Sequence, residues 1–147
     1  MKAIIAYTSI HHGNTEKVAK AMAKAMKAKL AKTSDVSAEA IKKYEVIGLG
    51  SGIYAGRHHP KVLELASRLS RKDVFIFSTA GIPSLKKIWH SSLRKRLEKN
   101  GCRIKGEFCC GGFDTFGPFR LVGGLQKGRP GKKNIKNAES FAKSIKQ

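Results

Sequence analysis

Short apolar runs of strand length alternate with longer segments of helical periodicity, and this alternation constrains the fold more than any other feature of the sequence. The runs at 3–6 and 74–77 are apolar throughout, which is typical of strands buried on both faces of a parallel sheet. The segments between such runs repeat apolar residues at helical spacing, as Val18, Met22 and Met26 do. Strands that alternate with helices in this way predict a parallel sheet covered by helices on both sides.

We therefore expect an α/β protein, a three-layer sandwich around a five-stranded parallel sheet, in a single domain over residues 1–147. The expected strands are Lys2–Tyr7, Lys29–Lys32, Glu45–Leu49, Asp73–Ser78 and Cys102–Gly112. The expected helices are Asn14–Lys27, Pro60–Leu69, Ser84–Lys99 and Asn137–Lys146.

Composition and charge narrow the class of protein. Hydrophobic residues make up 41% of the chain, and no apolar run approaches the ~20 residues of a membrane span. The chain enters its first predicted strand at once, so we expect no signal peptide and a cytoplasmic protein. The spacing of Cys102, Cys109 and Cys110 fits neither a metal site nor a redox pair. The formal net charge of +20 favours acidic partners.

The loop between the first strand and the first helix predicts an anion site. Free backbone N–H groups and the positive end of the helix dipole meet there, and Ser9, Asn14 and Thr15 can add hydrogen bonds to a phosphate. The alternative is an ordinary turn capped by Asn14 or Thr15. The pattern is neither that of a nucleoside-triphosphate loop nor that of a dinucleotide loop, which leaves a single terminal phosphate.

Two further loops follow strands at the same predicted edge of the sheet. The segment 50–59 carries three glycines and Tyr54, whose ring could stack on a planar ligand. The segment 78–83 is small and hydroxylated. Because ligands of such sheets bind at the carboxyl ends of the strands, the three loops together predict a flat aromatic ligand with a phosphate tail.

These residues resemble those of the flavodoxins and their flavodoxin-like relatives. The segment from Ser9 to Thr15 is similar to the family's flavin mononucleotide (FMN) phosphate loop, usually Ser/Thr-x-Thr-Gly-Asn-Thr, and Gly13-Asn14-Thr15 matches it outright. The loop is one residue longer here, with His11-His12 in place of the threonine. The resemblance implies the strand order 2-1-3-4-5, bound FMN and electron transfer, without a catalytic side chain.

The resemblance also implies which residues contact the cofactor, in three groups. The phosphate group comprises Ser9, His11, His12, Gly13, Asn14 and Thr15, and the group flanking the ring comprises Ser51, Gly52, Ile53, Tyr54, Ala55 and Gly56, with Tyr54 stacking. The pyrimidine edge would meet Thr79, Ala80 and Gly81.

The segment 112–133 is long for a connection and carries several phenylalanines. Its apolar part, 113–124, could cover the flavin, with Asp114 or Phe116 touching the ring, or it could dock a partner or a membrane interface. A well-packed loop is the third interpretation. The basic stretch 128–133 lacks interleaved aromatics, so we expect no specific nucleic-acid binding.

The histidine pairs at 11–12 and 58–59 make a zinc site conceivable, but nearby carboxylates or cysteines to complete it are missing, and we expect no metal. Phosphate or flavin contacts, or solvated rings, are the favoured interpretation.

Three functions remain open. The first is an FMN electron carrier that serves acidic redox proteins. The second is an FMN-dependent dehydrogenase or quinone reductase that resembles the flavodoxin-like protoporphyrinogen oxidases and works near a membrane. The third is a binding module with a vestigial cofactor site.

Overall fold

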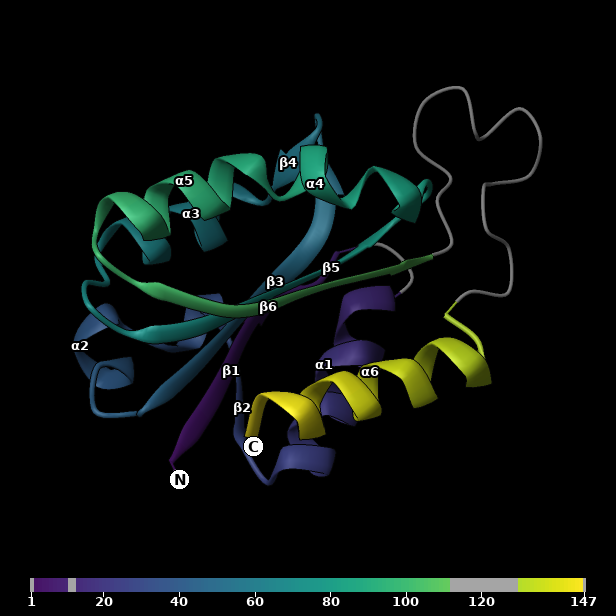
Figure 1. Cartoon of the computed structure of the whole chain (residues 1–147), viewed down its shortest axis with the longest axis horizontal. Coiled ribbons are helices and arrows are strands. Elements are labelled where there is room, and N and C mark those ends of the chain that lie inside the picture. Colours follow the sequence, from purple (N-terminus) through teal and green to yellow (C-terminus); the bar gives the residue numbers. More distant parts are fainter. Residues whose placement is uncertain (1, 11–12, 112–129, 147) are drawn as a thin grey trace.

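The computed structural model describes residues 2–10, 13–111 and 130–146, which form a three-layer α/β sandwich (Figure 1). The sheet contains β1 (Ala3–Thr8), β2 (Lys29–Lys32), β3 (Val46–Tyr54), β4 (Arg57–His58), β5 (Asp73–Ala80) and β6 (Arg103–Gly111). The helices are α1 (Asn14–Met26), α2 (Ala38–Ile41), α3 (Pro60–Ser67), α4 (Lys86–Trp89), α5 (Ser91–Lys99) and α6 (Lys132–Lys146). Short 3-10 turns cover Thr33–Asp35 and Pro83–Leu85.

Five strands run parallel in the order β2-β1-β3-β5-β6, which confirms the expected fold class and the expected order of the five parallel strands. β4 is an additional strand that pairs antiparallel with the end of β3. β3 reaches Tyr54, five residues beyond the expected end at Leu49, because residues 50–52 still pair with β5 and the last two pair with β4. The predicted 50–59 loop is therefore mostly strand and hairpin.

The helix expected over Ser84–Lys99 is divided. A 3-10 turn and α4 precede α5, and the junction lies at His90, whose side chain is fully buried. As a result Leu93 and Leu97 lie in the core while Trp89 remains partly exposed. The last helix begins at Lys132 rather than Asn137, because the Asn134 side-chain carbonyl accepts a hydrogen bond from the backbone N–H of Gly131.

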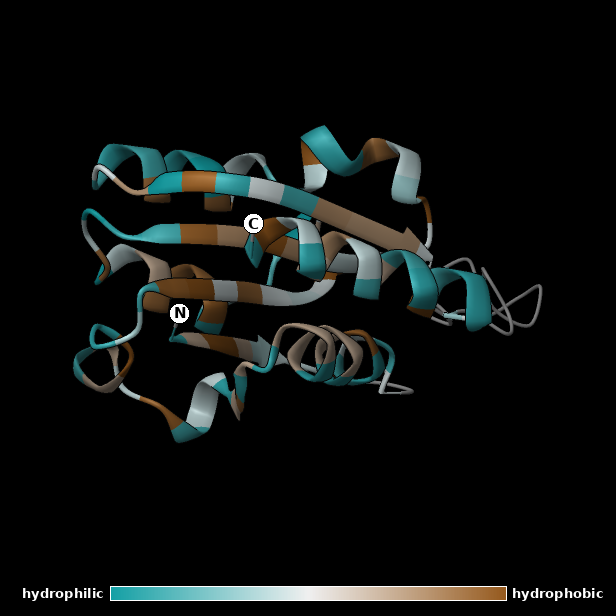
Figure 2. Ribbon diagram, turned by 60° about the horizontal axis from the view of Figure 1, so that its bottom comes forward, coloured by the Kyte–Doolittle hydropathy of each residue, from teal (hydrophilic) through white to brown (hydrophobic). Residues whose placement is uncertain are grey.

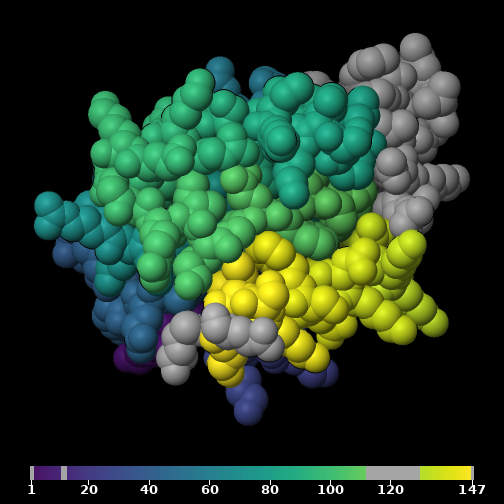
Figure 3. All heavy atoms as spheres, viewed as in Figure 1, coloured from purple at the N-terminus to yellow at the C-terminus, as the bar shows by residue number. Residues whose placement is uncertain are grey.

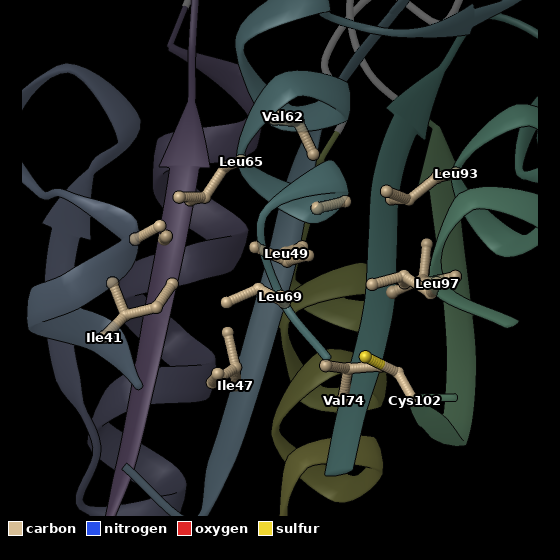
Figure 4. Packing of buried hydrophobic residues seen from close by; sticks show 14 of the residues in the cluster. Ile41, Ile47, Leu49, Val62, Leu65, Leu69, Val74, Leu93, Leu97 and Cys102 are labelled. Carbon is tan, nitrogen blue, oxygen red and sulfur yellow. The ribbon is translucent and has the colours of Figure 1, made fainter. Parts of the chain in front are cut away.

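Each face of the sheet packs against its own helices, and the strands carry continuous hydrophobic stretches (Figure 2). On one face Leu65 and Leu69 meet Ile47, Leu49 and neighbouring side chains (Figure 4). On the other face α1 and α6 lie side by side, and α6 borders β6 on the molecular surface (Figure 3).

Two glycines of β3 make the packing of the α1–α6 face possible. A Cβ added at Gly48 would lie 2.3 Å from the Phe75 ring, and one added at Gly50 would lie 2.4 Å from the Phe77 ring. Both rings are fully buried and occupy the space beside the glycines with which they are in register on the neighbouring strand. Within the described residues we find no helix with the length and apolar character that a membrane crossing requires.

Candidate functional site

The carboxyl ends of β1, β3 and β5 lie next to one another, so the structure brings together the three predicted loops. Thr8 is in register with Ser51, and Gly52 is in register with Thr79. Parallel pairing therefore places the start of α1, the β3–β4 hairpin and the segment after β5 along one edge of the sheet, as the sequence predicted.

The start of α1 lacks an ordinary side-chain cap. Gly13 occupies the N-cap position with φ +63°, and no side-chain hydrogen bond caps the helix from that position. The alternative in which Asn14 or Thr15 caps the helix is therefore wrong, since both lie inside its first turn. Ser9 instead reaches over the helix, where its hydroxyl accepts the backbone N–H of Glu16 at 3.2 Å.

The space beside Gly13 is open, since a Cβ added there would meet nothing within 4 Å. The left-handed backbone at Gly13, the positive end of the helix dipole and the open space suit a phosphate better than a packed turn does. Four predicted contacts, His11, His12, Asp114 and Phe116, lie outside the described residues, and so does most of the 112–133 segment.

Thr15 and Thr79 connect two of the site's segments. Their hydroxyls are 2.9 Å apart and both side chains are almost fully buried, as is Asn14. Thr79 thus faces α1, on the side of the phosphate loop, whereas the resemblance placed it at the pyrimidine edge. One hydroxyl donates to the other, so the pair retains one hydroxyl hydrogen for a further acceptor.

The β3–β4 hairpin turns through two residues of positive φ, Ala55 at 51° and Gly56 at 80°. Two such residues in succession are typical of the tight hairpin turns that follow the twist of the strands. Ser51 holds the base of the hairpin, because its buried hydroxyl accepts the backbone N–H of His59 at 3.0 Å. Tyr54 is partly exposed and meets the His59 ring edge-on, with 5.3 Å between ring centres.

Trp89 joins the hairpin to the segment after β5. Its indole N–H donates to the carbonyl of Ile82 at 2.8 Å, and its ring lies 3.8 Å from the position of a Cβ on Gly56. Among large hydrophobic residues, Ile10, Ile82 and Ile88 are exposed, by 45%, 43% and 60%. An apolar rim thus follows the loops of this edge, with Ala80 buried and Gly81 partly exposed beneath it.

A buried polar chain, which sequence reasoning missed, lies beneath the segment after β5. Ser78 Oγ and His90 Nε2 are 2.6 Å apart, and His90 Nδ1 is 2.9 Å from Glu107 Oε1. Arg94 then binds both carboxylate oxygens of Glu107, at 2.7 and 2.8 Å. The carboxylate accepts from Nδ1–H, so Nε2 accepts from the Ser78 hydroxyl.

His58 packs against this chain, with 4.9 Å between its ring centre and that of His90. Its Nε2 donates to the carbonyl of Phe77 at 2.9 Å, while its Nδ1 has no hydrogen-bond partner among the described residues. His58 is therefore a buried ring, not the flavin contact or solvated ring that the sequence favoured.

Burial determines whether the histidines of this buried polar chain are charged. Desolvation lowers the pKa of His58 to about 3 and that of His90 to about 4, so both rings are neutral near pH 7. The Arg94 and His90 hydrogen bonds lower the pKa of Glu107 despite its partial burial. Ser78 is fully buried within β5, so the serine, histidine and carboxylate hold the segment in place rather than meet a substrate.

The described residues contain no cluster of three histidine, cysteine or acidic side chains that could hold a metal ion. FMN, in contrast, fits the residues present. The open, glycine-led helix start suits its phosphate, and the hairpin tip, the apolar rim and Tyr54 suit a flat ring.

Known proteins agree with this geometry. A sequence model of the flavodoxin domain matches residues 4–113. An uncharacterized protein of Methanocaldococcus jannaschii is 49% identical over 147 residues, which cover 99% of this chain and 98% of that protein.

Solved flavodoxins share the fold at low sequence identity. A flavodoxin from the domain Archaea matches with a TM-score of 0.70 at 15% identity, over 99% of this chain and 96% of that one. Oxidised flavodoxin 2 of Bacillus cereus matches with a TM-score of 0.71 at 18% identity, over 99% and 97%. Rubredoxin oxygen:oxidoreductase of Desulfovibrio gigas reaches 0.73 at 17% identity, over 99% of this chain but 35% of that one. With the family match spanning most of its length, the chain belongs to the flavodoxin domain family.

Proposed function

We propose that the protein binds FMN at the carboxyl edge of its sheet and carries electrons between redox proteins. The observation that carries this proposal is the start of α1, where Gly13 has a left-handed backbone and open space beside it, at the sheet edge that also holds the hairpin and the segment after β5. Membership of a family that generally binds flavin supports it.

Each part of the edge would have its own task. The first-turn amides of α1, Ser9 and the Thr15–Thr79 pair would hold the phosphate. The hairpin tip and Tyr54 would flank the ring, and Trp89 would fix the distance between the hairpin and the Ile82 segment. When bound, FMN supplies the electron-accepting chemistry, while the protein binds, orients and partly shields it.

The positive surface charge indicates that the proposed partners are acidic. A net charge of +20 attracts acidic proteins and speeds their encounter at low ionic strength. We therefore propose acidic redox proteins as donors and acceptors, with docking near the apolar rim of Ile10, Ile82 and Ile88.

Titration of FMN into the purified protein, followed by visible absorbance and calorimetry, tests the cofactor. We expect Gly13→Asp to weaken FMN binding at least tenfold, since a carboxylate would stand at the phosphate site. Gly101→Asp is the matched control, because Gly101 also has a positive φ (+74°) and lies before β6, at the opposite edge of the sheet. Equal weakening by both variants would contradict the assignment of the phosphate site.

Stepwise anaerobic reduction of the loaded protein tests the reaction class. Two separate one-electron steps are expected of a carrier. Rapid turnover with quinones in a single two-electron step would instead favour the dehydrogenase or quinone reductase.

A further inference from the structure

We propose that a groove between the β3–β4 hairpin, α3 and α5 is the docking site for an acidic peptide segment of the redox partner. The inference rests on the proposed electron-transfer function for the nature of the partner, but the groove can be tested without the cofactor. It is a hollow of about 550 Å³, named the arginine groove below, lined by Tyr54, Ala55, Arg57, His58, Pro60, Leu63, Glu64, Ser67, Arg68 and Arg96.

Arginine is concentrated in this groove while lysine is spread over the surface. Of the six arginines within the described ranges, Arg94 and Arg103 are committed to Glu107 and Asp73. Three of the other four, Arg57, Arg68 and Arg96, line the groove. The planar fork of arginine binds a carboxylate through two parallel hydrogen bonds, which a lysine cannot provide. The groove is therefore suited to carboxylates, beyond the general attraction of the surface.

The three guanidinium groups are available to a partner. The Arg57 side chain has no hydrogen-bond or ion-pair partner in the described part of the chain. Arg96 donates to the Ser67 hydroxyl at 2.9 Å, which holds it over α3 with donors to spare. Arg68 contacts Glu64 at 3.3 Å, but both side chains are about two-thirds exposed (65% and 68%), so this pair is weak and a second carboxylate can displace it.

The length of the groove sets the size of the segment that it can take. The arginines are distributed along α3, from Arg57 just before the helix to Arg68 just after it. The eight residues of α3 span about 12 Å. An extended chain advances about 3.4 Å per residue, so the groove matches roughly four residues. Pro60, Leu63 and Tyr54 give it an apolar floor between the charges.

The groove adjoins the candidate flavin site through the hairpin. Tyr54 and Ala55 line the groove and also belong to the set expected to flank the ring. A partner anchored by acidic residues in the groove would therefore be separated from the proposed cofactor site only by the β3–β4 hairpin. This proximity is what an electron-transfer complex requires, and a random distribution of positive charge would not provide it.

The test compares two triple variants of equal charge. Arg57→Gln/Arg68→Gln/Arg96→Gln removes the groove's charges, and Lys24→Gln/Lys136→Gln/Lys143→Gln removes three exposed charges from the α1–α6 layer. The probe is a fluorescein-labelled peptide of eight glutamates, followed by fluorescence anisotropy at low salt without FMN. We expect the groove variant to bind at least tenfold more weakly than wild type and the lysine variant less than threefold more weakly.

Two outcomes overturn the proposal. One is an equal loss in both variants, which would mean that net charge alone binds the peptide. The other is groove-dependent binding to phosphatidylserine vesicles with no groove effect on the peptide, which would identify a membrane surface as the partner. Thermal unfolding of each variant confirms that it is folded. FMN titration of the same samples reports separately on the cofactor, so failure of the proposed function is distinguishable from failure of the groove.

Discussion

The two sides of β5 stabilise the candidate site by different means. On the α1–α6 side, Phe75 and Phe77 pack on the glycines of β3, and Thr79 makes a neutral hydrogen bond to Thr15. On the α3–α5 side, Ser78 begins a chain of ionisable groups that passes through His90 to Glu107 and Arg94.

The two faces of one strand thus stabilise the same site through interactions that respond differently to pH. The α1–α6 side depends on shape, so its contribution should not change with pH. The α3–α5 side depends on hydrogen-bonded charge and on two neutral histidines, so its contribution should change as the pH falls. Four measurements test this contrast.

The largest single-residue effect is expected on the apolar side, from Gly50→Ala. The added Cβ would lie 2.4 Å from the fully buried Phe77 ring, so the ring or the strand must move, which costs about 3 kcal/mol of unfolding free energy. Urea unfolding measures the loss. Gly52→Ala is the control, since its Cβ would meet only the movable end of Tyr54, at 3.1 Å, and should cost well under half as much. Similar losses at both positions would refute the packing argument.

The second effect is a loss of stability on acidification. With folded pKa values of about 3 and 4, His58 and His90 stay neutral in the folded state, while in the unfolded chain they bind protons below about pH 6.5. Stability should therefore fall as the pH drops below 6.5, by about 2 kcal/mol for each histidine between pH 7 and pH 5.

The His90→Gln variant identifies the source of this loss. It should lack about half of the decrease between pH 7 and pH 5 that wild type shows in urea unfolding. A pH dependence unchanged by the substitution would locate the proton uptake elsewhere.

The third effect is that of Glu107→Gln, which leaves Arg94 and His90 with a neutral partner. We expect a loss of about 1.5 kcal/mol at pH 7, because hydrogen bonds to a charged acceptor are stronger than those to an amide. Glu39→Gln is the control, since Glu39 pairs with Lys42 at the surface and should contribute less than 0.5 kcal/mol. The contrast is refuted if Glu39→Gln lowers the free energy of unfolding as much as Glu107→Gln does.

The smallest effect is that of Thr79→Val, about 1 kcal/mol, because the hydrogen bond to Thr15 is neutral. A double-mutant cycle with Thr15→Val isolates the pair, and the coupling should be the same at pH 7 and pH 5. A coupling that varies with pH would remove the distinction between the two sides.

Periodicity explains why much of the fold could be predicted. β1 and the start of α1 lie within a residue of their expected limits, since each has a clear pattern of apolar residues. β2 also has its expected limits, although its pattern is weak. The hairpin was missed because its glycines resemble a loop until β4 pairs with β3. The division of the helix at His90 was missed because the apolar spacing continues through it.

The candidate site could be located from its strand ends but not described in detail. Ser9, Gly13 and the segment after β5 lie where the loops were expected. The polar chain could not be found, because Ser78, His90 and Glu107 come from three separate elements and meet only in the folded protein. A histidine at the break of an otherwise helical segment was the one available signal.

The β3–β4 hairpin has a consequence for how this protein can evolve. Its strands pair locally through a two-residue turn, whereas the five parallel strands depend on long crossovers that fix the register of the whole sheet. Insertions or exchanges at Ala55 and Gly56 therefore leave the register of the sheet untouched. Selection can therefore vary the lining of the proposed flavin site there while the inherited scaffold stays the same.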